Sequence, residues 1–424
     1  MRLTVLLLLA VAASGCERPL VDPLSRTVET VGVDLGEVRT EPSLVLGLRV
    51  RGATVLTVNG DTALYDAGTQ VFSRTLALLP GVNRLVVRAS DPSGEVAADT
   101  LVALHLPLVN EAVSAFALPS PRAEAAVVVA GSRVLVTGGV GPAGAALASM
   151  AVLVPTGPRF AGTDVPLLAA RAGHTASLLP DGSVLLVGGA TAETPTRAAD
   201  FVQTVEVVLP GSSQSRAVEL PDGRPARAGH TARVLETGGR TVVYLYGGLV
   251  PAGAGVAESG SVDVFEWDGA RLVRRSPDGG AGAFAAQSGH VQIPLSDSGT
   301  AIDAVVGLDA ALRFVFTAPG GVYPFDLAAR DALPLAAPRR DAAGAPLTVA
   351  GLGLVVGGRD ASGSVLGSAE VVTAGRTFRV PAGVRLLVPR TGAGATLLRD
   401  GRILIAGGRT SGGTVSGASE VYSY

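Results

Sequence analysis

Polar side chains that recur at regular intervals are the first candidates for chemistry in this sequence. One position is an arginine in five segments and a glutamine in a sixth: Arg122, Arg171, Arg227, Gln287, Arg340 and Arg390. A guanidinium group matches the geometry of carboxylate and phosphate groups. Two interpretations are therefore open. The arginines form a set that binds an anionic ligand, or each has a structural role, bound to backbone or to a neighbouring acid, which we favour.

Histidines and carboxylates recur in the same way. The histidines are His174, His230 and His290, and the carboxylates are Glu206, Asp263, Glu370 and Glu420. Equivalent positions of packed sheets lie about 10 Å apart, too far to share a zinc ion with bonds of roughly 2.0–2.1 Å. Paired carboxylates can do acid–base chemistry, but one copy in each repeat favours a scaffold role. We expect no catalytic residue, no metal site and no cofactor.

Short strands must position these side chains. A strand that ends in a glycine pair recurs as VLVTGG, VLLVGG, VYLYGG, GLVVGG and ILIAGG, and a degenerate copy, DAVVGL, lies between the third and fourth. The copies follow one another at intervals of 50 to 60 residues. Hairpin turns such as Asp181-Gly182 and Asp400-Gly401 precede several of them, since glycine accepts the positive φ of a tight turn. Repeats of this length indicate four-stranded units that close radially.

These elements resemble the kelch repeat, and the resemblance covers residues 111–424. It implies an all-β fold with a six-bladed kelch β-propeller over residues 108–424, closed by an N-terminal strand at 113–118. Some kelch domains hold acidic peptides with arginines at the position described above. Galactose oxidase-like enzymes need a crosslinked cysteine, and none is available here. Bacterial sialic acid mutarotases, which are kelch proteins without a cofactor, remain an alternative.

A separate module precedes the repeats, at residues 30–107. Apolar runs alternate there with turn sequences, which predicts a small antiparallel sandwich. The pattern resembles bacterial extracellular Ig-like modules in Val58-Asn59-Gly60, Gly68, Phe72, Leu79-Pro80-Gly81, Asn83, Leu85, Val87, Ala89, Asp91 and Gly94. We expect a spacer or adhesion domain.

The N-terminus predicts export and lipidation. Arg2 precedes an apolar run of about 11 residues, which is too short to span a bilayer. The run ends in Ala13-Ser14-Gly15-Cys16, which resembles the lipobox of bacterial lipoproteins and implies a signal peptide at 1–15 and a lipid on Cys16, the single cysteine. Residues 16–29 are expected to be a tether. The resemblance implies a cell-envelope protein, with the outer membrane favoured.

Composition and charge narrow the function. The chain has 424 residues, 34 basic residues that are all arginine, 36 acidic residues and a net charge of −2, which excludes a dominant electrostatic contact with nucleic acid. The repetition of the same residues favours a non-catalytic binding or scaffolding protein over an enzyme. We expect a monomer whose partner is an envelope protein or an anionic glycan or peptide. The alternative is a carbohydrate-active enzyme of the sialic acid mutarotase type.

Overall fold

The chain is built from β-strands. The computed structural model describes residues 27–111, 117–156, 159–223, 225–275, 286–296, 301–307, 313–318, 321–325, 335–373 and 376–424. Within these ranges the helical elements are single turns, η1 (Ala198–Asp200) and η3 (Ala382–Val384), and none could cross a membrane. The all-β prediction is confirmed.

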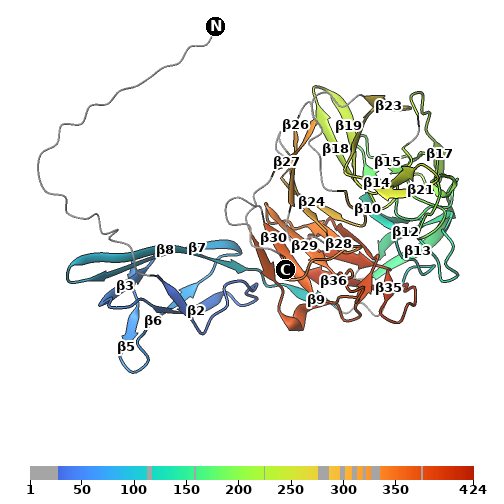
Figure 1. The fold of residues 1–424 in the computed structure, drawn as a ribbon. Helices are drawn as coiled ribbons and strands as arrows, with labels where there is room; N and C mark the ends of the chain where they lie inside the picture. The colour runs from blue at the N-terminus through green and yellow to red at the C-terminus, as the bar shows by residue number, and fades with distance from the viewer. Residues whose placement is uncertain are drawn as a thin grey trace, which may run out of the picture. The chain divides into compact units, whose positions relative to one another are not determined.

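The chain divides into two compact units (Figure 1). The first comprises the described residues up to 35 together with 43–103, and the second comprises 36–42 together with 104–424. The sequence placed the boundary near residue 107 and did not separate 36–42. This segment belongs to the second unit because its backbone continues a sheet edge there: Val38 N–H donates to the Arg379 carbonyl at 2.8 Å, and Arg379 N–H donates to the Gly36 carbonyl at 2.8 Å.

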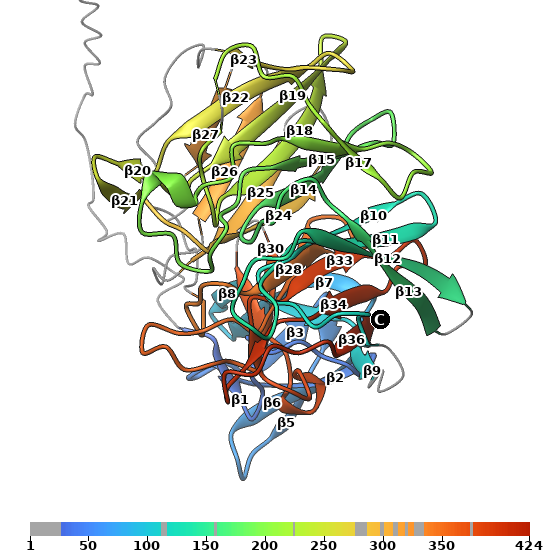
Figure 2. The same cartoon turned by 90° about the vertical axis from the view of Figure 1, so that its right-hand side faces the viewer.

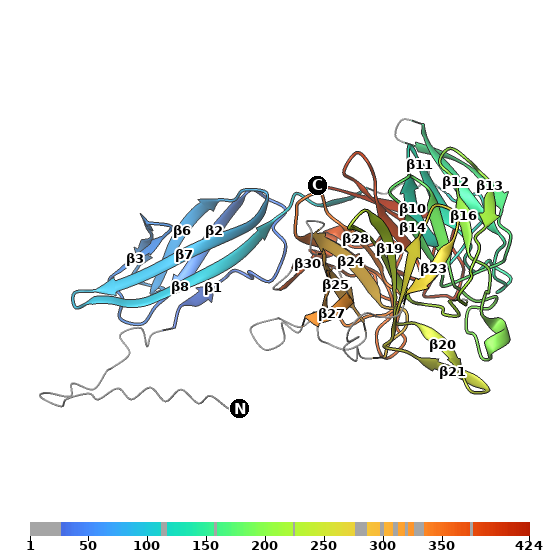
Figure 3. The same cartoon turned by 90° about the horizontal axis from the view of Figure 1, so that it is seen from above.

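The first unit consists of two four-stranded antiparallel sheets around one core (Figure 3). In order, they are β1 (Glu29–Val31), β2 (Ser43–Arg49), β6 (Val71–Ala77) and β5 (Leu64–Asp66), then β4 (Asp61–Thr62), β3 (Val55–Val58), β7 (Gly81–Asp91) and β8 (Gly94–His105). Both sheets contribute to the core, for example Leu46 and Phe72 from one and Leu56 and Val87 from the other. Alternation of apolar residues along each strand produces this arrangement.

Within the described residues of the second unit there are six four-stranded antiparallel sheets. In sheet order, the strands are β10 (Ala126–Ala130), β11 (Arg133–Thr137), β12 (Ser149–Thr156), β13 (Arg159–Pro166); β14 (Thr175–Leu178), β15 (Val184–Val187), β16 (Glu206–Val208), β17 (Ser215–Ala217); β18 (Thr231–Thr237), β19 (Arg240–Tyr246), β22 (Val262–Trp267), β23 (Leu272–Arg275); β24 (Val291–Ser296), β25 (Ala301–Val306), β26 (Arg313–Ala318), β27 (Gly321–Phe325); β28 (Ala343–Pro346), β29 (Leu352–Val356), β30 (Ala369–Thr373), β31 (Thr377–Arg379); and β33 (Gly394–Leu397), β34 (Ile403–Ala406), β36 (Ser419–Ser423), β9 (Val109–Glu111).

The first strands of these sheets contact one another in cyclic order, β10 with β14, β14 with β18, and onward to β33, which contacts β10. Figure 2 shows β14 and β15 between β10 and β18. Every residue of β15 and β34 is buried, because each second strand lies between two neighbouring sheets. This is why those strands are continuous apolar runs and do not alternate. Two ladders, β20 (Leu249–Ala252) with β21 (Gly255–Glu258) and β32 (Arg390–Thr391) with β35 (Arg409–Thr410), extend from the strand ends.

The strand that completes the last sheet is β9, not the expected 113–118. Tyr422 pairs with Asn110 in an antiparallel register. The Asn110 amide fixes this register, since it donates to Glu420 Oε2 at 2.6 Å and to the Arg385 carbonyl at 2.7 Å. Of the expected strand, residues 113–116 lie outside the described residues, and Ala117 forms an isolated bridge with Ala418.

Candidate active site

Five buried arginines bind the carboxylates and glycine carbonyls of their own sheets. We call them the clamp arginines: Arg122, Arg171, Arg227, Arg339 and Arg390, each 3% exposed or less. They pair with Asp164, Glu206, Asp263, Glu370 and Glu420 at 2.5–2.8 Å. Each also donates to the carbonyl of the first glycine of the Gly-Gly pair, at 2.5–3.1 Å. Because each of these guanidiniums is buried and binds both an acid and a backbone carbonyl, the geometry supports the structural interpretation.

Two members of the predicted arginine set lie elsewhere. In the fifth repeat the clamp arginine is Arg339, and the predicted residue, Arg340, is the next one along the chain. The structure differs because the hairpin of this repeat is one residue longer, so spacing to the Gly-Gly pair selects Arg340, whereas the buried contact to Glu370 belongs to Arg339. In the fourth repeat, Gln287 donates to the Tyr246 hydroxyl at 3.0 Å.

The recurrent histidines link neighbouring sheets. His174 Nε2 lies 2.7 Å from Thr137 Oγ1, and His230 and His290 contact Thr175 and Thr231 in the same way. Burial lowers the pKa of all three, that of His290 to about 3, so they are neutral at pH 7. Among the described residues there is no His, Cys, Asp or Glu cluster that could hold a metal ion.

A closed ring of backbone hydrogen bonds surrounds the centre of the sheets. Each repeat contributes one member, two residues after its clamp arginine or, in the fourth repeat, two residues after Gln287. We call these residues the axial ring: Glu124, Gly173, Gly229, Gly289, Asp341 and Gly392. Each N–H donates to the carbonyl of the preceding member around the ring, at 2.6–3.0 Å. All six have φ between +52° and +63°. Four are glycines, which adopt this conformation freely, but Glu124 and Asp341 hold it with full side chains.

The two acidic members of the axial ring depend on the glycines beside them. A Cβ at Gly392 would overlap the Glu124 carboxylate, and a Cβ at Gly289 would overlap the Asp341 carboxylate. Each acid therefore leans over the preceding glycine of the ring. Strained residues of this kind persist where the surroundings enforce them, which is common in functional sites.

Burial changes the acidity of both Glu124 and Asp341. Burial, followed by the neighbouring charges of Asp341 and Glu193, raises the pKa of Glu124 to about 8. Burial also raises the pKa of Asp341, although Arg359 opposes this through hydrogen bonds of 2.7 and 2.6 Å to Asp341 Oδ2. At neutral pH Glu124 is thus a protonated acid, whereas the hydrogen bonds from Arg359 favour the carboxylate form of Asp341.

A cavity of about 340 Å³ opens above these carboxylates. Two ion pairs stand around it, Arg340 with Glu258 at 2.7 Å and Arg409 with Glu193 at 2.7 Å. Both arginines keep about a quarter of the side chain exposed. We call this hollow the axial cavity. It places an acid, a base and partly exposed cations on one solute-sized space, a combination suited to proton transfer on a polar ligand.

Most residues of the axial cavity were not predicted from the sequence. Their signal is a departure from the repeat. Glu124 and Asp341 replace the glycine of the axial ring, and Arg359 and Arg409 directly follow a Gly-Gly pair where other repeats have Val140 or Ala190. Glu193 lies in a loop and Glu258 ends β21, and the fold alone brings them to Arg409 and Arg340, so the spacing in the sequence does not reveal these ion pairs.

Comparison with known proteins supports the fold. No protein-family model and no curated protein matches the sequence. Among solved structures, the chain is similar to YjhT, with a TM-score of 0.54 and 14% sequence identity over 72% of this chain and 95% of that one. The kelch-like β-propeller expected from the repeats is therefore confirmed.

The same comparison corrects one prediction. YjhT is a sialic acid mutarotase, an enzyme, and this finding overturns the expectation that the chain is not an enzyme. That expectation rested on the repetition of identical residues around the ring. The repeated residues are the clamp arginines and their acids, whereas the residues of the axial cavity differ from repeat to repeat. Residues that differ between repeats, gathered at one cavity, are what a single site on a repetitive kelch-like β-propeller would show.

Proposed function

We propose that the second unit is a cofactor-free enzyme that opens and recloses the ring of a sugar, and so interconverts its anomers. The observation that carries the proposal is the pair Glu124 and Asp341, which are held in left-handed backbone in the axial ring, line one cavity, and include an acid whose pKa is raised to about 8. The similarity to a sialic acid mutarotase supports the same assignment.

The reaction needs one acid and one base. The Asp341 carboxylate accepts the proton of the anomeric hydroxyl, and the Glu124 carboxyl donates its proton to the ring oxygen. The bond between the anomeric carbon and the ring oxygen breaks, which leaves an open-chain carbonyl compound. After rotation about the adjacent carbon–carbon bond, the same hydroxyl attacks the other face of the carbonyl while both protons return. Atoms balance, and no oxidant or reductant takes part.

The rest of the axial cavity fits a small polar ligand. Its volume of about 340 Å³ lies in the range of small-molecule sites. Arg340 and Arg409 present guanidinium groups whose exposed N–H donors can bind hydroxyl or carboxylate groups of the sugar. The third arginine that lines the cavity is Arg359, which binds Asp341.

The test is the relaxation of a freshly dissolved single anomer towards equilibrium, followed by polarimetry or proton NMR with catalytic amounts of the protein. N-acetylneuraminate, glucuronate and galactose form a panel of two acidic sugars and one neutral sugar. We expect acceleration for an acidic sugar, and a loss of about 100-fold or more in Glu124→Gln and in Asp341→Asn. Glu236→Gln, an exposed acid on β18, is the matched control.

Two outcomes would refute the proposal. One is that no sugar of the panel relaxes faster with the protein than without it. The other is that the Glu124→Gln and Asp341→Asn variants are as active as the unaltered protein, because the acceleration would then arise elsewhere.

We also propose that this enzyme is anchored to the cell envelope through Cys16, with the first unit as an Ig-like spacer. Cys16 lies outside the described residues, so the support is the apolar run and the Ala13-Ser14-Gly15-Cys16 sequence. Two or more acyl chains anchor a protein stably, whereas one alone binds a membrane reversibly. Metabolic labelling with a fatty acid, lost in Cys16→Ser, tests the anchor.

A further inference from the structure

A second cavity lies at the other end of the sheets from the axial ring. Its volume is about 440 Å³. Strand β14 shows the direction: it begins at Thr175, just after Gly173 of the axial ring, and ends at Leu178 in the wall of this cavity. We call it the distal cavity. It is separate from the residues proposed to act on a sugar.

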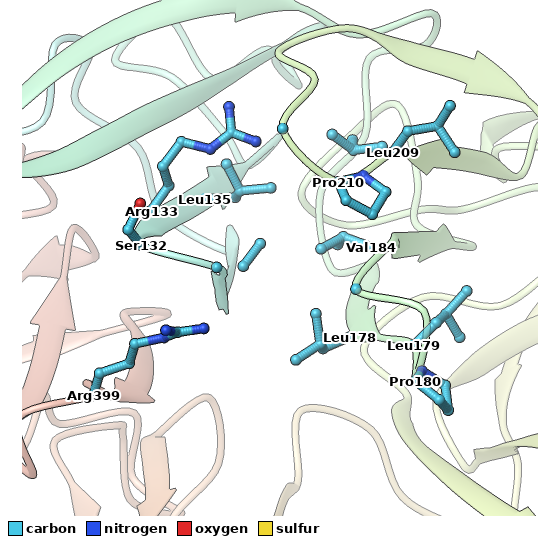
Figure 4. Close-up of a pocket in the computed structure, with 15 residues that line it drawn as sticks. Ser132, Arg133, Leu135, Leu178, Leu179, Pro180, Val184, Leu209, Pro210 and Arg399 are labelled. Carbon is cyan, nitrogen blue, oxygen red and sulfur yellow. The ribbon is translucent and has the colours of Figure 1, made fainter.

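Turns of three neighbouring sheets form the distal cavity. They are the β10–β11 turn, the β14–β15 and β16–β17 turns, and the β33–β34 turn. One wall is apolar and consists of Leu178, Leu179, Pro180, Leu209 and Pro210 (Figure 4). Leu178 is 45% exposed, so its side chain is accessible to a ligand in the cavity.

The opposite side is cationic. Figure 4 shows Arg133 and Arg399 facing the apolar wall across the open space. The Ser212 carbonyl accepts a hydrogen bond from Arg133 Nη2 at 2.9 Å, which leaves other N–H donors of this guanidinium for a ligand. Within the part of the chain that the structure describes, no carboxylate pairs with Arg399, and no acidic residue lines the cavity.

This distribution of charge differs from that of the axial cavity. The chain as a whole carries a net charge of −2, and the axial cavity combines arginines with acids. The distal cavity has two positive charges and no negative one among the described residues that line it. Guanidinium groups bind carboxylates through paired hydrogen bonds, and an apolar wall stabilises a ligand by removing its hydrocarbon from water. The two features together select a ligand that has both an anionic head and an apolar body.

We propose that the distal cavity binds an organic monocarboxylate with an apolar chain, its carboxylate between Arg133 and Arg399 and its chain against Leu178 and Pro210. The size of the cavity suits a small molecule. The site does not depend on the sugar chemistry of the axial cavity, and either proposal can fail while the other holds.

Isothermal titration with octanoate tests the site on the full-length protein. Octanamide retains the chain and lacks the charge, and acetate retains the charge and lacks the chain. We expect one octanoate per protein, with octanamide and acetate each bound at least tenfold more weakly. Arg399→Gln and Arg133→Gln should each weaken octanoate by about tenfold or more, as expected for a lost hydrogen bond to a charged group.

Arg240→Gln is the matched control, because Arg240 begins β19 as Arg133 begins β11, outside the distal cavity. Octanoate affinity should be unchanged in this variant. Four results would overturn the proposal: no binding of octanoate, equal binding of octanamide, unchanged affinity in both Arg399→Gln and Arg133→Gln, or the same loss in Arg240→Gln. Anomer relaxation measured on the same samples shows whether the axial cavity is intact.

Discussion

Replacement of Glu124 by glycine should stabilise the propeller and abolish its proposed activity. Glu124 holds φ +55° in the axial ring, where four of the six members are already glycine. A left-handed backbone costs an L-residue about 1–2 kcal/mol, and glycine removes this cost. Glycine also destabilises the folded state by roughly 0.5–1 kcal/mol, because it has greater freedom in the unfolded chain. The backbone change alone is therefore slightly favourable, by between about 0 and 1.5 kcal/mol.

Removal of the Glu124 carboxyl group has a greater effect on stability, and this effect depends on pH. The pKa of Glu124 is about 8 in the folded protein against 4.5 for the unperturbed group. A raised carboxyl pKa means that folding favours the protonated form, so stability present below pH 4.5 is lost as the pH rises towards 8. Full linkage would amount to roughly 3 kcal/mol between pH 5 and pH 8, and water at the cavity mouth reduces this to about 2 kcal/mol.

Thermal unfolding at pH 5 and at pH 8 separates the backbone effect from the carboxyl effect. The Glu124→Gly variant should gain little at pH 5 and several °C in Tm at pH 8, at about 2–4 °C per kcal/mol. The Glu124→Gln variant should show the pH-dependent gain without the backbone gain. A gain that is equal at the two pH values, or a loss of stability at pH 8, would refute the reasoning about Glu124.

Three other substitutions test particular contacts and the anchor. Arg171→Met leaves Glu206 as an unpaired buried charge and should destabilise the protein by about 3–5 kcal/mol in urea unfolding; a change below about 1 kcal/mol would contradict the clamp. Gly392→Ala places a Cβ on the Glu124 carboxylate at φ +61°, so anomer relaxation should slow at least tenfold and stability should fall by about 1–2 kcal/mol; full activity would contradict the proposed geometry. Cys16→Ser should move the protein from the detergent phase to the aqueous phase in phase partition, and an unchanged distribution would count against the anchor.

The fold was largely predictable because it depends on what the repeats share. Gly188-Gly189 and its counterparts mark the end of each second strand, and clamp residues such as Arg171 recur at fixed distances from them. Their period and apolar pattern are visible in the sequence and lead to radial closure. The closing strand was misplaced because its register depends on the contact between Asn110 and Glu420, residues far apart in the chain.

The candidate site was not predictable by the same method because it depends on what the repeats do not share. Alignment of the repeats on the hairpin and the Gly-Gly pair selected Arg340 in place of Arg339. The same alignment did not single out Glu124 and Asp341, although side chains in left-handed backbone are uncommon and are often found at functional sites. The ion pair of Arg409 with Glu193 joins residues 216 positions apart, and only the folded ring brings them together.

The pH dependence of anomer relaxation tests the central claim most directly. The catalysed rate, corrected for the spontaneous reaction, should be highest below pH 8 and fall as the pH rises past about 8, because Glu124 then loses the proton that it donates to the ring oxygen. The Glu124→Gln variant should be inactive and should therefore show no fall in catalysed rate above pH 8. A catalysed rate that keeps rising through pH 9, or a profile that is the same in Glu124→Gln, would contradict the assignment of Glu124 as the acid of the site.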